Sequence, residues 1–201
     1  EAVEMSSKRS KGFVNALLRN FMRADMKWVE PDGELERISV RYSVPAELCE
    51  IISRDYGEER AENIISGLCR ARGLNLRVNT LKISRDDLLL RFAEAGISAK
   101  ASELSPFGIE LEASAALEKI PGFEEGLWYV QDTASQLTSY ILDPKAGERV
   151  IDCCACPGGK SFSAAIDGEG EAEIHSFDLH ANKLSLINAT AKKLGLSCIT
   201  T

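Results

Sequence analysis

The feature that most constrains the fold is a glycine-containing loop between an apolar run and a helix, followed by a second run and a second helix. The segment "ERVIDCCA" predicts a strand that leaves into a loop, and "KSFSAAI" predicts the first turns of a helix. "EIHSFDL" predicts a second strand, "ANKLSLINATAKKLGL" a helix that ends before Gly195, and "SCIT" the start of a third strand. This alternation is typical of a parallel, doubly wound sheet. We therefore predict an α/β fold for residues 126–201, opening with a strand at "LWYVQD" and a helix at "TASQLTSYIL".

The preceding part of the chain reads as a small α+β module over residues 40–125. Two helices are predicted first, from Pro45 to about Tyr56 and from Glu58 to Arg72, the second with Ile64, Ile65 and Leu68 inward. "LNLRVNTLK" alternates apolar and polar residues, which predicts a half-buried strand. Ser84 and Asp87 resemble a capping box for a helix to Ala95, and short strands are expected at 97–101 and 109–111. Before this module, "KGFVNALLRNFMRA" predicts an amphipathic helix.

Composition narrows the class of protein. The net charge of −7 argues against a general nucleic-acid coat protein, although local basic patches could still bind RNA. Three of the six cysteines crowd four positions, which suits reduced thiols better than a disulfide framework. No apolar run of 18 residues and no signal-peptide pattern occur, so we predict a soluble, cytoplasmic protein without a membrane partner. A start at Glu1 and an end at Thr201 lead us to expect a piece of a longer chain.

The loop "CCACPGGKS" could cradle a ligand, because it follows the carboxyl end of a predicted parallel strand. Gly158 and Gly159 let the backbone approach a ligand closely, and the helix that opens near Lys160 offers unpaired N–H groups. A phosphate-binding P-loop is an alternative, but Cys154 stands where that motif needs its first glycine. The G-x-G-x-x-G pattern of dinucleotide enzymes is also absent.

Asp178 points to a nucleoside. It ends the next predicted strand, 19 residues after Gly159, where a carboxylate hydrogen-bonds ribose hydroxyls in folds of this kind. A glycine loop and a ribose carboxylate without a phosphate nest suit S-adenosylmethionine. In the simpler alternative, the glycines form only a turn and Asp178 only caps the next helix.

Cys153 and Cys156 form a C-x-x-C pair. A zinc site would need a second pair with ligand spacing, which the sequence lacks, so we assign no metal. Redox use stays open, because C-x-x-C thiols have lowered pKa values. The simplest interpretation is that these small side chains fill the space beneath the loop.

Several blocks occur together and in order: "KGFVNALLRN", "LRVNTLK", "GLWYVQDTASQL", "LDPKAGERVIDCCACPGGKSF", "FDLHANKL" and "NATAKKLGL". With them the chain resembles the bacterial 16S ribosomal RNA (cytosine-5)-methyltransferase family of the Sun/Fmu type. The resemblance implies the last helices of a helical RNA-binding domain at residues 1–30, a small linking module at 40–125, and the N-terminal half of a Rossmann-like, S-adenosylmethionine-dependent methyltransferase domain at 126–201.

The resemblance also implies site residues. The cofactor loop would consist of Cys154, Ala155, Cys156, Pro157, Gly158, Gly159 and Lys160, with Asp178 as the ribose-binding acid and Lys183 as a basic residue nearby. Cys156 departs from the alanine that is usual in the family. The family's cysteine nucleophile lies in Thr-Cys-Ser and a second functional cysteine in Pro-Cys-Ser, and neither tripeptide occurs here. We therefore assign no catalytic residue and expect this piece alone to be inactive.

The expected partner is 16S ribosomal RNA, with Arg19, Arg23, Arg77 and Lys82 as candidate contacts, although these could equally form an ordinary solvated face. An incomplete sheet would expose a strand edge, and a second copy of the chain could pair with that edge. Two other functions stay open at this point: a non-catalytic RNA-binding module and a P-loop-like nucleotide-binding protein.

Overall fold

The structure is a computed structural model that describes residues 2–24, 31–69, 73–112 and 116–201. The chain forms two compact units, residues 1–71 and 72–201. Within the described residues, no helix is long and apolar enough to span a bilayer.

The first unit is helical. Its helices are α1 (Ala2–Met5), α2 (Lys11–Arg23), α3 (Glu34–Tyr42), α4 (Ala46–Tyr56) and α5 (Glu58–Cys69). α3, α4 and α5 surround a small core formed by Ile38, Cys49, Ile52, Ala61 and Ile65. The predicted helices at 11–23, after Pro45 and from Glu58 are confirmed, whereas α3 was not predicted. Leu68, predicted to face inward, is 64% exposed.

The second unit begins with an antiparallel sheet. Its strands are β1 (Leu74–Val78), β2 (Ala99–Ala101), β3 (Gly108–Leu111) and β4 (Trp128–Val130), in the order β2-β3-β1-β4. Helix α6 (Arg85–Glu94) packs against it, and a short 3-10 turn follows at Leu117–Lys119. The predicted cap of α6 is confirmed, because the Ser84 hydroxyl accepts a hydrogen bond from the Asp87 N–H at 3.1 Å.

β1 differs from its prediction in one respect. It lies between β3 and β4, and both of its faces are covered rather than one. Leu76 and Val78 lie in the apolar core on one face, while Arg77 and Asn79 are fully buried on the other. The polar residues are inward because they bond groups far away in the sequence: Asn79 donates to the carbonyls of Gly126 and Leu194 at 3.0 and 2.9 Å.

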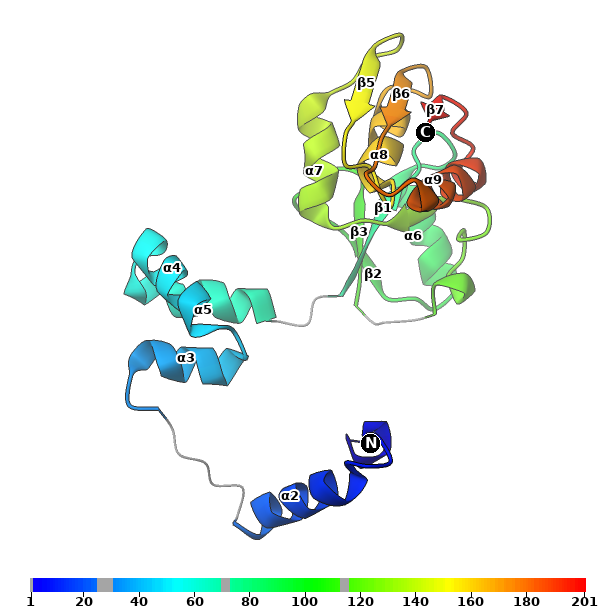
Figure 1. The fold of residues 1–201 in the computed structure, drawn as a ribbon. Helices are drawn as coiled ribbons and strands as arrows, with labels where there is room; N and C mark the ends of the chain where they lie inside the picture. Colours follow the sequence, from blue (N-terminus) through cyan, green and yellow to red (C-terminus); the bar gives the residue numbers. More distant parts are fainter. Residues whose placement is uncertain (1, 25–30, 70–72, 113–115) are drawn as a thin grey trace. The chain divides into compact units, whose positions relative to one another are not determined.

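The rest of the second unit is the parallel sheet that the sequence predicts (Figure 1). β5 (Arg149–Asp152), β6 (Glu173–Ser176) and β7 (Ile199–Thr200) pair in that order, all parallel. Helices α7 (Thr133–Leu142), α8 (Gly159–Asp167) and α9 (Ala181–Leu194) connect and flank them, with α8 against the strands. In this three-stranded sheet β5 and β7 are the edges. Pairing with a second copy through such an edge stays a prediction.

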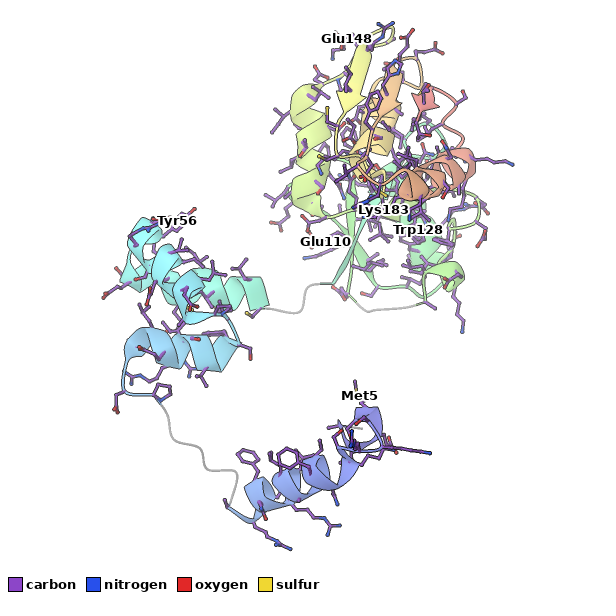
Figure 2. The ribbon with its side chains drawn as sticks, in the orientation of Figure 1. Met5, Tyr56, Glu110, Trp128, Glu148 and Lys183 are labelled. Carbon is purple, nitrogen blue, oxygen red and sulfur yellow. The ribbon has the colours of Figure 1, made fainter. Side chains whose placement is uncertain are left out.

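β4 joins the two halves of this unit. The segment "LWYVQD" was predicted as the opening strand of the methyltransferase domain, but β4 pairs with β1 in the antiparallel sheet. Successive side chains of a strand point to opposite faces. Trp128, labelled in Figure 2, is therefore buried in the core of the antiparallel sheet, and Tyr129 in the core of the parallel sheet.

Candidate cofactor site

The candidate site is the loop that leaves the carboxyl end of β5. Asp152, the last residue of that strand, holds the beginning of the loop: one carboxylate oxygen accepts from the Cys154 N–H at 3.3 Å and the other from the Ser161 hydroxyl at 2.8 Å. Ser161 in turn accepts from the hydroxyl of Ser176, the last residue of β6, at 2.8 Å. The ends of two neighbouring strands and the first turn of α8 are thus connected through short polar side chains.

The loop backbone is bound to the end of the next strand. The Ala155 N–H donates to the Phe177 carbonyl at 2.9 Å, and the Cys156 N–H donates to the Asp178 carboxylate at 3.1 Å. The Gly158 N–H turns back to the Ala155 carbonyl at 2.6 Å, and the Cys156–Pro157 peptide is cis. The loop therefore lies directly beside Asp178, and a ligand site shared by the two stays a prediction.

Gly158 needs to be glycine for two reasons. Its φ of +110° lies in a region that residues with a side chain rarely adopt. A Cβ at this position would also lie 2.3 Å from the Phe162 ring. Gly159 is less demanding, since a Cβ there would be 3.5 Å from its nearest neighbour, the Gln131 amide nitrogen.

Asp178 is held as an ionised acceptor. Its second carboxylate oxygen accepts from the His180 N–H at 3.0 Å. Hydrogen bonds from the backbone N–H groups of His180 and Cys156 lower the pKa of this carboxyl, and the charge of Lys183 acts in the same direction. An ionised carboxylate retains free lone pairs toward solvent, which suit the hydroxyl groups of a ribose.

The remaining predicted loop residues lie together, with different exposures. Ala155 is buried, Cys156 is half-buried, and Cys154, Pro157 and Lys160 are exposed. The Cys156 thiol donates to the Lys183 carbonyl at 3.6 Å, so Lys183 (labelled in Figure 2) adjoins the loop through its backbone. The cysteines are free thiols, and within the described part of the chain no group of His, Cys, Asp or Glu could hold a metal ion.

Three residues that sequence reasoning missed hold the first turn of α8. Gln131 donates to the Gly159 carbonyl at 3.0 Å, and Ser163 and Tyr129 contact the same carbonyl at 2.9 and 3.4 Å. All three are buried. The block "VQDTASQ" contains Gln131 but neither Tyr129 nor Ser163, and nothing in its spacing said what Gln131 touches.

The four predicted RNA contacts divide between the two units, two in each. Arg19 and Arg23 are exposed on α2 in the first unit. Lys82 is exposed, and its ammonium donates to the carbonyls of Glu125 and Lys193 at 2.8 and 3.0 Å. Arg77 requires a correction: it is fully buried, ion-paired with Asp167 and stacked at 4.5 Å on Phe107, so it is not part of a surface that RNA could reach.

A parallel sheet with a glycine loop after one strand and a carboxylate after the next defines the class of Rossmann-like domains that bind a nucleoside-containing cofactor. Two family models match this chain: "Methyltr_RsmF/B-like, ferredoxin-like domain" over residues 44–118 and "16S rRNA methyltransferase RsmB/F" over residues 139–201. By these matches and the relatives below, the chain belongs to the RsmB/F family of 16S rRNA methyltransferases.

Curated relatives agree with this assignment. The chain is 34% identical to the probable ribosomal RNA small subunit methyltransferase B of Bacillus subtilis, over 99% of its own length and 45% of the relative. It is 32% identical to the protein of the same description from Synechocystis, over 92% and 42%. The chain thus spans less than half the length of the curated relatives it matches.

Solved structures show the same fold. The crystal structure of PH0851 covers 99% of this chain and 45% of its own, with a TM-score of 0.82 and 26% identity. A methyltransferase homologue from Pyrococcus horikoshii gives 0.75 and 29%, covering 85% of this chain and 56% of its own. NSun6 from the same organism, determined with SFG, gives 0.71 and 22%, covering 78% and 64%.

Proposed function

We propose that this chain carries part of the S-adenosylmethionine site of an enzyme that methylates 16S ribosomal RNA. The observation that carries the proposal is the contact between the glycine loop and Asp178, whose ionised carboxylate accepts a hydrogen bond from the Cys156 N–H. Loop residues 154–160 and Asp178 would hold the nucleoside, with Lys183 beside them. The bound cofactor would supply an electrophilic methyl group on a sulfonium.

The loop suits a nucleoside better than a phosphate. A phosphate nest requires several N–H groups that point at the ligand. Here the N–H groups of Cys154, Ala155, Cys156 and Gly158 each donate to an acceptor within the protein. The charge of Asp178 would also repel a phosphate, whereas it attracts hydroxyl donors. These contacts favour the methyltransferase over the P-loop alternative.

The comparisons support the substrate. Relatives that match most of the chain are described as ribosomal RNA small subunit methyltransferases. A neighbour of the same fold was determined with SFG, an analogue of S-adenosylmethionine. Because the chain spans less than half of those relatives, activity on 16S RNA, and the cytoplasmic location that such a substrate implies, are proposed for the whole protein.

We further propose carbon 5 of a cytosine as the methylated atom, on the basis of the sequence resemblance. That chemistry needs a cysteine thiolate to add to carbon 6, so that carbon 5 becomes nucleophilic. None of the six cysteines lies in a Thr-Cys-Ser or Pro-Cys-Ser segment. Cys49 is buried in the helical core, and Cys154 and Cys156 lie on the proposed cofactor loop itself. We expect the nucleophile to be supplied by sequence outside these 201 residues.

Calorimetric titration with S-adenosylmethionine tests the cofactor site. We expect binding by the unsubstituted chain that is lost in Asp178→Ala, because the ribose hydroxyls lose their acceptor. Asp86→Ala, which removes an exposed carboxylate on α6, is the control and should bind as the unsubstituted chain does. ATP that binds competitively and depends on Lys160 would contradict the proposal.

Transfer of a labelled methyl group to unmodified 16S RNA tests the missing nucleophile. We expect no transfer by this chain alone. Turnover that survives simultaneous replacement of Cys153, Cys154 and Cys156 by serine would contradict the proposal that the nucleophile lies outside these 201 residues.

A further inference from the structure

The side chain of Gln131 connects the antiparallel sheet to the first residue of α8. Its amide nitrogen donates to the Gly159 carbonyl at 3.0 Å, and its amide oxygen accepts from the Ser163 hydroxyl at 2.9 Å and the Tyr129 hydroxyl at 3.2 Å. Gln131 is 5% exposed and Ser163 is fully buried. In a buried setting, these hydrogen bonds are worth more than at the surface, because water cannot replace them.

Gln131 is itself fixed by its backbone. Its N–H continues the ladder with β1 by donating to the Asn75 carbonyl at 3.1 Å. Its carbonyl accepts from the Gln136 side chain at 2.9 Å, and Gln136 is also fully buried. The side chain that reaches α8 therefore projects from a rigid point of the antiparallel sheet.

The bond acts at the point where the glycine loop becomes a helix. Gly158 has the left-handed φ of the turn, and Gly159 is the first residue of α8. Phe162, one turn into the helix, lies under Gly158 and packs edge-on against Tyr129, with ring centroids 5.6 Å apart. Tyr129 and Gln131 lie on the same face of their strand, so both contact the same turn.

From this geometry we infer that Gln131 is a positioning residue, which fixes the cofactor loop through the Gly159 carbonyl without touching the cofactor. Gln131 directly follows β4 of the antiparallel sheet, and the loop follows β5 of the parallel sheet. The antiparallel sheet thereby sets the position of a loop that belongs to the other sheet. The identity of the cofactor in this inference rests on the proposed function, whereas the claim that Gln131 positions the loop is independent of it.

Hydrogen exchange of the ligand-free chain tests the positioning. In Gln131→Met, which keeps the volume but loses the donor, the amides of Ala155, Cys156 and Gly158 should exchange about tenfold faster, the effect of one net hydrogen bond. Ser139→Ala is the control, because Ser139 bonds Asp167 at the opposite end of α8 at 2.6 Å. The Ser139→Ala variant should leave the ratio of the exchange rates of the loop amides to those of the β6 amides unchanged. Equal acceleration in the loop and in β6 by Gln131→Met would reduce Gln131 to a general stabilising role and overturn the inference.

Gln131→Glu gives a second readout. A glutamate keeps the acceptor for Tyr129 and Ser163, but it can donate to the Gly159 carbonyl only when protonated, and burial raises the pKa of a carboxyl. Affinity for S-adenosylmethionine, relative to the unsubstituted chain at the same pH, should be about tenfold weaker at pH 8 and should recover toward pH 5. Dividing by the affinity of the unsubstituted chain removes every pH effect that does not come from residue 131. Tyr129, which contacts the Gln131 amide oxygen, has its pKa raised by burial, and the charges of Arg77 and Asp167 act on the Tyr129 hydroxyl.

The two readouts separate the two claims. An unsubstituted chain that shows no binding of S-adenosylmethionine would contradict the proposed function, while the exchange experiment would still decide the role of Gln131. A relative affinity of the Glu variant that does not change with pH, together with unaltered loop exchange in Gln131→Met, would refute the inference alone.

Discussion

At the scale of single residues, the loop depends on close packing under Gly158. The Phe162 ring occupies the space that a Cβ would need, and Tyr129 packs edge-on against that ring. The backbone turns sharply at this position because no side chain is present to prevent it. Glycine is thus required both for its backbone conformation and for lack of space, and a glycine that meets only the first requirement separates the two effects.

We predict that Gly158→Ala lowers the free energy of unfolding by about 2 to 5 kcal/mol. This is the sum of the cost of a left-handed backbone conformation for alanine and the cost of overpacking against the Phe162 ring. Gly147→Ala is the matched control, since Gly147 has φ +79° with open space around it, and should lose only about 1 to 2 kcal/mol. Urea denaturation measures both. Equal losses in the two variants would show that the Phe162 contact contributes nothing.

Asp178 gives a prediction in pH. Its pKa is lowered in the folded chain, so its stabilising contribution is complete above the unfolded value near 3.8 and is lost as pH falls through the lower folded value. The difference in unfolding free energy between the unsubstituted chain and Asp178→Asn should therefore be constant from pH 7 to about 5 and shrink below 3.8. Denaturation at several pH values checks this, and a difference that grows toward acid would contradict it.

The residues of the loop could be predicted from the sequence, and their supports could not. Asp178 follows Gly159 by 19 residues, a spacing that predicted a site shared by the loop and this carboxylate, and their role in binding a cofactor stays a prediction. Gln131 and Ser163 lie 32 positions apart, and their contact depends on how two sheets pack. Arg77 shows the same limit: its alternation with Leu76 indicated a solvent-facing side chain, but its partner Asp167 is 90 positions away.

At the scale of elements, Arg77 ties β1 to the last residue of α8. It pairs with Asp167 and donates to the Gln136 carbonyl at 3.4 Å, while Asp167 also accepts from Ser139. Arg77 is fully buried and Asp167 is 10% exposed, so neither charge can be satisfied by water if the other is removed. Removal of one partner from a buried pair is costly for this reason.

We predict that Arg77→Met destabilises the second unit by about 3 to 5 kcal/mol, because it leaves the Asp167 carboxylate buried without its partner. Adding Asp167→Leu to this variant should restore much of the loss, since two apolar groups leave no buried charge. Thermal and urea unfolding measure both variants. A double variant that is no more stable than Arg77→Met would show that packing on Phe107, rather than charge, dominates.

The element that the sequence did not predict is α3. Ile38 is buried in the helical core with Leu35 and Tyr42 packed against the same core, so α3 has apolar residues at helical spacing but is only 9 residues long. The preceding Pro31, Asp32 and Gly33 read as a loop. α9, in contrast, repeats Ile187, Ala191 and Leu194 on one buried face before Gly195 and was predicted to within its ends.

At the scale of the whole molecule, the two units have separate buried cores. Ile38, Cys49, Ile52, Ala61 and Ile65 form that of the first unit, and the antiparallel and parallel sheets supply those of the second. Each unit therefore has the interior that independent folding requires. The domain limits of 1–30, 40–125 and 126–201 remain a prediction.

We predict that residues 72–201 expressed alone fold cooperatively and bind S-adenosylmethionine as the full chain does. Circular dichroism during urea unfolding and calorimetric titration measure these properties. A single transition with the same cofactor affinity is the expected result. Loss of the transition would show that α3, α4 and α5 contribute to the stability of the second unit.

The double-sided placement of β4 affects how proteins of this family can be dissected. The matched family regions end at residue 118 and resume at 139, so Trp128, Tyr129 and Gln131 lie in the interval between them. A truncation that starts at 139 would discard Tyr129, whose ring packs against Phe162, and the Gln131 amide that binds the first residue of α8. Weak ligand binding by such a piece would then result from the loss of the residues that support the loop, and it would not show that the site itself binds weakly.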